Sequence, residues 1–352
     1  MQSNPFDISF GKKPQESIAR IRQSKEILDA FMAEPIVQQV YMITGVRGSG
    51  KTVLMNSIAN RLEEEKDWIV VRLNPDRDLL LSMGAKLSGD QRCAEVFRLA
   101  KLNLSAFGFG VSIEGVPPIN DIEAVLERML KSLKKQRKRV LVTIDEVTNN
   151  PQIRTFCSSF QIFIGQELPV FLLMTGLYEN IYSLQNEKNL TFLYRAPKIT
   201  MDPLSISMIA ARYESVFSVS REEGLKMANL TKGYPFAFQA LGYSVWRSPD
   251  DENHYMNDYR QILEEFVYEK IWSGLSAKDK RIVGGIAHCP DGKISKIVAY
   301  LKLKKDEINQ YRRRLIHKGI VNGDEYGYLT FALPLFDVFV QDKTAMQNET
   351  WK

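Results

Sequence analysis

Cysteine and histidine are scarce in this chain, with three of each among 352 residues. Cys93, Cys157 and Cys289 are odd in number, far apart and without metal-ligand spacing, so we expect free thiols in a reducing compartment. The histidines are equally scattered, and we predict no metal site built on them. No apolar run approaches the roughly 18 residues that a membrane span needs, and the N-terminus lacks a signal-peptide pattern. These absences predict a cytoplasmic protein with no membrane contact.

The composition is that of an ordinary globular protein. The chain is 44% hydrophobic and 25% charged, with a formal net charge of +5. This length and composition allow two or three domains.

Residues 45–52 carry the most specific motif in the sequence. They read Gly-Val-Arg-Gly-Ser-Gly-Lys-Thr and fit the phosphate-binding pattern G-x-x-x-x-G-K-[ST] at every fixed position. An apolar run at 40–43 predicts a buried strand before the loop, and a helical pattern begins at Thr52. The glycines let backbone N–H groups point at phosphate oxygens, Lys51 adds positive charge, and the Thr52 hydroxyl suits Mg²⁺. The motif predicts ATP or ADP with Mg²⁺, bound by Gly45, Val46, Arg47, Gly48, Ser49, Gly50, Lys51, Thr52 and Val53.

A second motif supplies carboxylates. Residues 140–144 form a β-branched run that ends in Asp145 and Glu146. A buried parallel strand delivers such acids to the edge of an α/β sheet where ligands bind. We expect Asp145 to hold Mg²⁺ through water, and Glu146 to polarise the attacking water in a positioning and general-base role. Lys51 completes this catalytic set, and the adjacent carboxylates favour hydrolysis over phosphoryl transfer to a metabolite.

Three further strands are expected at residues 68–73, 170–175 and 196–201. Thr175 ends the second of these, and its hydroxyl either senses the γ-phosphate and the attacking water or caps the strand end. Arg195 precedes the last strand. It is either an arginine finger, acting within its own subunit or in a neighbour, or a solvated side chain.

The combination of these motifs resembles the AAA+ and STAND-type P-loop ATPases, in particular bacterial and archaeal proteins related to the Orc1/Cdc6-like group. The resemblance covers roughly residues 4–335. In that family an N-terminal segment frames the adenine and a G-x-P element belongs to a helical lid. The resemblance implies nucleotide contacts from residues at both places, namely Pro5, Phe6, Ile18, Arg20, Tyr234 and Pro235.

Two departures from the family pattern bear on turnover. The related proteins usually have an arginine directly after the lid proline, where this chain has Phe236. STAND proteins tend to have an arginine soon after the fourth strand, where this chain has Gly176 and Leu177. The resemblance therefore implies slow hydrolysis or a nucleotide-gated switch.

Between the second strand and Asp145, residues 76–139 form a long insertion. Its glycine-punctuated alternation at 107–115 predicts an exposed hairpin or loop, which either contacts a partner or simply connects elements. A helix is expected next, at 119–133. After Pro203 the pattern becomes helical, with helices at 205–217 and 220–230 and a third from Pro235. We expect these three helices to form a lid over the nucleotide.

Residues from about 275 predict a winged helix-turn-helix. Helices are expected at 278–287, 294–300 and 305–318, and a two-stranded wing at 320–321 and 328–331. Residues 275–343 hold 13 Lys and Arg against 8 Asp and Glu, an excess of +5 that equals that of the whole chain. This charge predicts contact with double-stranded DNA, while a protein-docking or autoinhibitory role stays open. The candidate DNA contacts lie at or near the third helix, and they are Lys304, Lys305, Arg312, Arg313, Arg314 and Lys318.

The predicted fold is α/β, with an AAA+-like P-loop NTPase sheet followed by a helical lid and a winged helix. The expected boundaries are 1–203 for the ATPase core, 204–272 for the lid, 273–343 for the winged helix and 344–352 for a polar tail. We expect an ATP-binding protein whose slow Mg²⁺-dependent hydrolysis drives a conformational switch near DNA. The alternatives are a signalling switch or scaffold whose winged helix binds protein or a second copy, and, least favoured, a metabolite kinase.

Overall fold

The fold is described from a computed structural model, which describes residues 3–9, 14–100, 107–108 and 120–349. The chain divides into two compact units. The sheet unit comprises residues 20–44 and 51–200, and the helical unit comprises residues 1–19, 45–50 and 201–352.

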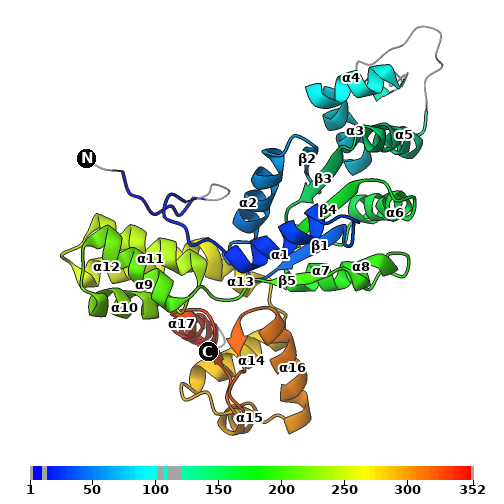
Figure 1. The fold of residues 1–352 in the computed structure, drawn as a ribbon. Coiled ribbons are helices and arrows are strands. Elements are labelled where there is room, and N and C mark those ends of the chain that lie inside the picture. Colours follow the sequence, from blue (N-terminus) through cyan, green and yellow to red (C-terminus); the bar gives the residue numbers. More distant parts are fainter. Residues whose placement is uncertain (1–2, 10–13, 101–106, 109–119, 350–352) are drawn as a thin grey trace. The chain divides into compact units, whose positions relative to one another are not determined.

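The sheet unit alternates strands and helices, as the sequence predicts (Figure 1). Its strands are β1 (Val40–Thr44), β2 (Trp68–Leu73), β3 (Arg139–Ile144), β4 (Val170–Gly176) and β5 (Lys198–Thr200). Its helices are α1 (Ile21–Met32), α2 (Lys51–Glu63), α3 (Leu79–Gly89), α4 (Gln91–Leu99), α5 (Ile122–Lys135), α6 (Pro151–Gly165), α7 (Tyr178–Gln185) and α8 (Thr191–Arg195).

The five strands form a parallel sheet in the order β2-β3-β4-β1-β5. All five residues of β1 and all seven of β4 are buried. Alternate β4 residues face opposite layers: Leu172 packs in the main core of the unit, whereas the ring of Phe171 packs against Phe31 of α1 and Trp68. Burial on both faces explains why these strands read as continuous apolar runs. The predicted P-loop NTPase sheet is therefore confirmed.

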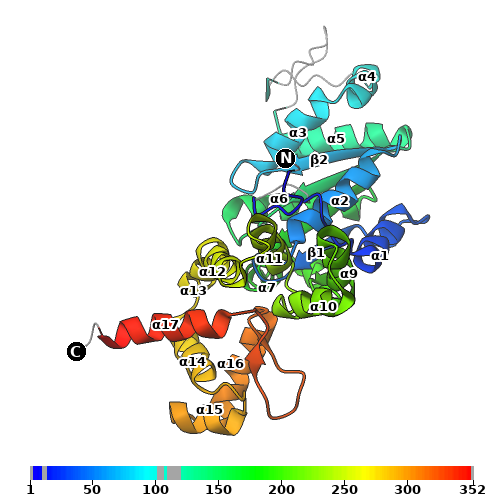
Figure 2. The same cartoon turned by 90° about the vertical axis from the view of Figure 1, so that its left-hand side faces the viewer.

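The helical unit is built from helices and one small ribbon (Figure 2). Its helices are α9 (Ile206–Phe217), α10 (Arg221–Leu230), α11 (Pro235–Arg247), α12 (Glu252–Leu263), the π-helical turn η2 (Glu264–Tyr268), α13 (Glu269–Ser273), α14 (Ala277–His288), α15 (Ile294–Leu301), α16 (Lys305–His317) and α17 (Phe336–Glu349). The short strands β6 (Val321–Asn322) and β7 (Thr330–Phe331) pair antiparallel. Three helices and a ribbon thus follow one another between residues 277 and 331, in the predicted order.

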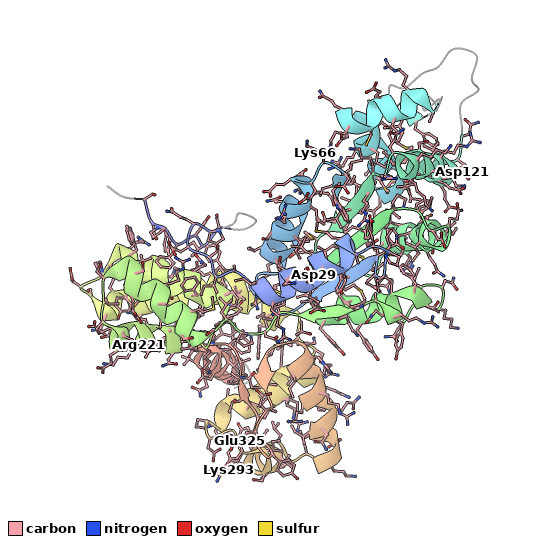
Figure 3. All side chains as sticks on the ribbon, in the orientation of Figure 1. Asp29, Lys66, Asp121, Arg221, Lys293 and Glu325 are labelled. Carbon is pink, nitrogen blue, oxygen red and sulfur yellow. The ribbon has the colours of Figure 1, made fainter. Side chains whose placement is uncertain are left out.

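Local sequence signals explain several helix boundaries. Ser220 and Glu223 form a capping box at the start of α10, with the Glu223 N–H donating to the Ser220 hydroxyl at 3.3 Å. Pro235 is the first residue of α11, where its missing N–H costs nothing. Charged side chains lie on the outside of the elements, as the labelled residues Asp29, Lys66, Asp121, Arg221, Lys293 and Glu325 illustrate (Figure 3).

The N-terminal segment differs from the expectation that residues 1–203 form one domain, because residues 1–19 group with the helical unit. Phe6 is 2% exposed and its ring packs against Tyr213, Phe217 and Phe238. Gly242 of α11 leaves room for that ring, since a Cβ there would lie 2.5 Å from it. This apolar contact, which sequence periodicity could not reveal, ties the segment to α11.

Other differences concern single elements. Residues 344–349, expected in a polar tail, belong to helix α17, and α12, η2 and α13 extend the helical region beyond the three expected helices. The last strand of the sheet, β5, is shorter than predicted, so Arg195 ends helix α8 and does not adjoin a strand. Helix α5 begins at Ile122, later than expected. The hairpin or loop predicted at 107–115 lies outside the described residues except for Phe107 and Gly108.

Candidate functional site

Four polar residues of the sheet unit meet at the ends of its central elements. Thr52 is the second residue of α2, Asp145 and Glu146 follow β3, and Thr175 lies in β4. The Thr52 hydroxyl donates to Oδ2 of Asp145 at 2.8 Å. The Thr175 hydroxyl donates to the other oxygen, Oδ1. Both oxygens of Asp145 are thus fixed by hydroxyl groups from neighbouring elements, and the sequence predicted neither hydrogen bond.

Glu146 has an unusual backbone. Its φ is 52°, in the left-handed region that non-glycine residues rarely adopt. The Glu146 N–H donates to Oγ1 of Thr175 at 3.2 Å and to Oδ1 of Asp145 at 3.1 Å, and the next N–H, that of Val147, donates to the Thr175 carbonyl at 2.8 Å. These bonds hold the turn after β3, and they leave the Glu146 side chain exposed. Strained conformations of this kind occur at functional sites because the surrounding structure enforces them.

Thr175 is fully buried, and its hydroxyl forms hydrogen bonds with both Asp145 and Glu146. The hydroxyl donates to Asp145 and accepts from Glu146, so it positions both acids. Both the sensor and the capping interpretations of Thr175 stay predictions.

The residues present fit Mg²⁺. This hard cation prefers oxygen ligands and usually takes one or two protein oxygens, with phosphate and water supplying the others. The Asp145 carboxylate and the Thr52 hydroxyl offer such oxygens 2.8 Å apart. Among the described residues no cluster of three or more His, Cys, Asp or Glu side chains could bind a metal by itself.

The glycine-rich loop, residues 45–50, connects β1 to α2 and has the backbone that its sequence predicts. Gly48 and Gly50 have φ values of 71° and 87°. Lys51, the next residue, is 8% exposed. Within the helical unit, the Tyr234 hydroxyl donates to the Arg47 carbonyl at 2.5 Å and the Phe236 N–H donates to the Gly48 carbonyl at 3.1 Å. Residues at the start of α11 therefore bind the loop backbone, a contact that the sequence did not reveal.

The residues expected to frame adenine differ in how far they are buried. Pro5, Phe6 and Tyr234 are buried, whereas Ile18 and Arg20 are half-buried. Phe6 is packed among aromatic rings, and Pro235 opens α11. Phe6 therefore acts as a core residue.

Arg195 is exposed at the C-terminal end of α8.

The predicted DNA-contacting residues separate into internal and exposed groups. Arg314 donates to Oδ1 of Asp279, a carboxylate that is 2% exposed, and Arg312 donates to the Gly323 carbonyl. Both guanidinium groups are thus engaged inside the domain. Arg313 and Lys304 are exposed and Lys318 is half-buried, while the side chain of Lys305 lies outside the described residues.

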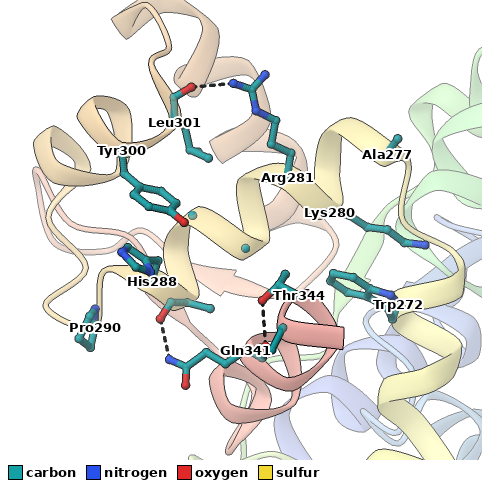
Figure 4. A pocket seen from close by; sticks show the side chains of 14 residues that line it. Trp272, Ala277, Lys280, Arg281, His288, Pro290, Tyr300, Leu301, Gln341 and Thr344 are labelled. Atoms are coloured by element: carbon teal, nitrogen blue, oxygen red, sulfur yellow. Dashed lines mark hydrogen bonds between the residues drawn. The ribbon is translucent and has the colours of Figure 1, made fainter. Parts of the chain in front are cut away.

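The C-terminal helices also line a pocket of about 900 Å³ (Figure 4). Its walls include Trp272 of α13, Lys280 and Arg281 of α14, and the stacked rings of His288 and Tyr300, whose centroids are 4.0 Å apart. None of the predicted site residues lines this pocket. The described nucleotide-site residues lie elsewhere in the chain.

The parallel sheet, the glycine-rich loop and the paired hydroxyl and carboxylate oxygens define a P-loop ATPase domain. A family model described as an ATPase domain predominantly from Archaea matches residues 23–193, and a domain of unknown function matches residues 265–340. The ATPase model covers most of the sheet unit and agrees with the ATPase part of the expected resemblance. No curated protein matches the chain in sequence.

Two solved structures resemble the chain over nearly its whole length. The Walker-type ATPase PABY2304 of Pyrococcus abyssi has a TM-score of 0.65 at 16% identity, covering 92% of this chain and 95% of that one. The ORC2 protein of Aeropyrum pernix, in ADPNP–ADP complexes, has a TM-score of 0.61 at 14% identity, covering 96% and 98%. At such identities the similarity establishes the fold. No helix among the described residues is long and apolar enough to cross a membrane.

Proposed function

We propose that this chain binds ATP with Mg²⁺, hydrolyses it slowly and uses the change of nucleotide to switch the conformation of its helical unit. The observation that carries the proposal is the hydrogen-bonded set of Thr52, Asp145, Thr175 and Glu146. The family match over residues 23–193 supports ATPase chemistry, and the ADPNP–ADP complexes of the Aeropyrum protein support nucleotide binding.

Each residue has a distinct chemical role in this proposal. The loop N–H groups and Lys51 bind the phosphates, and Thr52 with Asp145 holds Mg²⁺. When bound, Mg²⁺ would neutralise charge that develops on the phosphate oxygens. The exposed Glu146 carboxylate orients the attacking water and accepts its proton.

We expect slow turnover because, among the described residues, few positively charged side chains are placed to neutralise the transition state. Phe236 stands where related proteins usually have an arginine, so the lid offers no charge there. Arg195 is exposed at the end of α8, which favours a finger supplied to a neighbouring copy over one acting within its own subunit. If Arg195 acts as a finger in a neighbouring copy, the chain should self-associate when ATP is bound.

The test is phosphate release from ATP by the wild-type chain, Lys51→Ala and Glu146→Gln. We expect Lys51→Ala to lose ATP binding, and Glu146→Gln to keep binding while losing at least 100-fold in turnover. Unchanged turnover in Glu146→Gln would remove Glu146 from the mechanism. Retained ATP binding by Lys51→Ala would contradict the phosphate site itself.

For the C-terminal domain we propose a winged helix that contacts duplex DNA through α16. Asn309, Gln310, Arg313 and His317 are all exposed and recur at helical spacing, so they form one outward face. Such a face offers the donors and the positive charge that DNA recognition uses. Binding to a duplex should weaken as salt rises from 50 to 200 mM.

One observation favours the alternative, a domain that docks on protein. The tip of the β6–β7 ribbon presents the exposed carboxylates of Asp324 and Glu325 beside Tyr326, which is 99% exposed. Carboxylates at this tip would repel phosphates, whereas an exposed tyrosine is a common protein contact. ATP turnover that does not respond to duplex DNA, without salt-sensitive DNA binding, would favour the protein-docking function.

A further inference from the structure

Tyr234, expected to contact the nucleotide, contacts the backbone of the phosphate-binding loop. Tyr234 is 4% exposed, and its hydroxyl lies 2.5 Å from the Arg47 carbonyl oxygen. Burial raises the pKa of the Tyr234 phenol well above its usual range, so the hydroxyl stays protonated and donates. Two residues later, the backbone N–H of Phe236 donates to the Gly48 carbonyl at 3.1 Å. The start of α11 thus binds two consecutive peptide units of the loop.

Because peptide units are planar, this contact also sets the direction of backbone N–H groups in the loop. In a trans peptide the C=O and the N–H lie in one plane and point in opposite directions. Fixing the Arg47 carbonyl therefore also fixes the direction of the Gly48 N–H, and fixing the Gly48 carbonyl fixes that of the Ser49 N–H. The N–H groups of such a loop are the donors that bind phosphate oxygens. In the structure the Ser49 N–H closes a turn onto the Val46 carbonyl at 3.3 Å.

The fit at Gly48 is close. A Cβ there would lie 2.3 Å from the Tyr234 hydroxyl oxygen and 2.8 Å from Cβ of Phe236. The loop and the start of α11 are in direct contact at this point. Glycine at position 48 is therefore what allows Tyr234 and Phe236 to approach the loop this closely.

We propose that Tyr234 is a positioning residue that orients the phosphate-binding peptide units through the Arg47 carbonyl and couples nucleotide binding to the state of helix α11. The proposal rests on the proposed ATP-binding function and deepens it. It assigns the coupling to a neutral hydroxyl that binds the loop backbone. Tyr234 touches no reacting atom in this role.

Tyr234→Phe is the direct test because it removes the hydroxyl and keeps the ring. Tyr213→Phe is the matched control: Tyr213 is also buried in the helical unit, and its hydroxyl donates to a backbone carbonyl, that of Phe238, at 2.8 Å. Three quantities are measured on the full chain: amide hydrogen exchange of residues 45–50 without nucleotide, ATP affinity by calorimetry, and the midpoint of thermal unfolding.

Both variants should lose comparable stability, since each loses one buried hydrogen bond. Only Tyr234→Phe should speed exchange of the loop amides and weaken ATP binding, by about five- to tenfold. Loop exchange and affinity that match those of Tyr213→Phe would overturn the proposal, as would faster exchange with unchanged affinity.

Failure of the proposed function gives a different result. If the wild-type chain binds no more ATP than Lys51→Ala, ATP binding itself is wrong. The exchange measurement needs no nucleotide, so it still reports whether the Tyr234 hydroxyl holds the loop.

Discussion

The hydroxyl of Thr52 donates to Oδ2 of Asp145 at 2.8 Å, joining two residues that are 93 positions apart in the chain. This bond links the start of α2 to the end of β3 and sets two candidate Mg²⁺ ligands side by side. The second oxygen of Asp145 is bound by Thr175. The direction of the carboxylate is therefore set by two hydroxyl groups before any ligand arrives, which reduces the reorganisation that binding requires.

Replacing Thr175 tests this arrangement. Thr175→Val keeps the shape of the buried side chain but removes the donor to Asp145 and the acceptor for the Glu146 N–H. We expect a loss of about 1–3 kcal/mol in the free energy of unfolding, because the fully buried Thr175 loses both hydrogen bonds of its hydroxyl, and a fall of roughly tenfold or more in ATP turnover. Thr175→Ser retains the hydroxyl and should keep most of the turnover. Equal turnover in the two variants would show that the hydroxyl does not position the acids.

Gly48→Ala tests the contact between Tyr234 and the loop by changing the loop. Alanine is strained at a φ of 71°, and its Cβ would lie 2.3 Å from the Tyr234 hydroxyl oxygen. Gly327→Ala is the control, because Gly327 has a φ of 86° with nothing within 4 Å of a Cβ. Calorimetry should show at least tenfold weaker ATP binding for Gly48→Ala, whereas the control loses about 1 kcal/mol of stability and no affinity. Affinity that survives in Gly48→Ala would mean that the loop tolerates displacement.

Arg313 and Arg314 are neighbours with different expected effects. Arg314 is paired with the buried Asp279 and its guanidinium lies 5.0 Å from the ring centre of Tyr311, whereas Arg313 is exposed. Arg314→Ala should lower the free energy of unfolding by about 1–3 kcal/mol, since it strands a buried carboxylate. Arg313→Ala should leave stability unchanged and reduce the salt dependence of DNA binding by about one unit of slope. Chemical denaturation and DNA titration at two salt concentrations measure both quantities. A stability loss in Arg313→Ala would contradict the assignment of the two side chains.

The sequence predicted the sheet because its strands are buried on both faces and its loop motif is specific. The sequence predicts β2 at its observed bounds. Ser220 and Pro235 likewise indicate where helices α10 and α11 begin. These signals are local, and local chemistry is readable from a sequence. The two motifs predict Thr52 and Asp145 as groups around one Mg²⁺, but the direct hydrogen bond between them was not predicted.

Contacts between distant segments were not readable. Nothing in the residues around Tyr234 indicates that its hydroxyl reaches the Arg47 carbonyl, 187 positions away. The pairing of Arg314 with Asp279 likewise depends on how α14 and α16 pack, which a count of basic residues does not show. The contact of Phe6 with Gly242 of α11 is a further example, because nothing in the sequence pattern around either residue predicts it.

The buried thiols predict a dependence on pH. Burial raises the pKa of Cys93 and Cys157 to about 12, far above that of a free thiol. Alkylation by iodoacetamide at pH 8 should therefore spare both in the native protein and modify them in denaturant. Because the folded pKa is raised, this contribution to stability is complete below the unfolded pKa of about 8.5 and is lost as pH rises toward 12. Rapid native labelling of either thiol at pH 8 would contradict its burial.

Thr44 offers a substitution that should increase stability. It ends β1 directly before the loop, is 4% exposed, and its hydroxyl has no hydrogen-bond partner among the described residues. Valine has the same shape and a high strand propensity, so Thr44→Val should raise the free energy of unfolding by about 1 kcal/mol. Thr231→Val is the matched control. Thr231 is equally buried, but its hydroxyl donates to the Ala228 carbonyl at 2.6 Å and accepts the Gly233 N–H at 3.1 Å, so its loss should cost about 1–3 kcal/mol. ATP affinity measured on Thr44→Val separates two outcomes: unchanged affinity leaves the hydroxyl as an unsatisfied core group, whereas a clear loss would make it part of the nucleotide site.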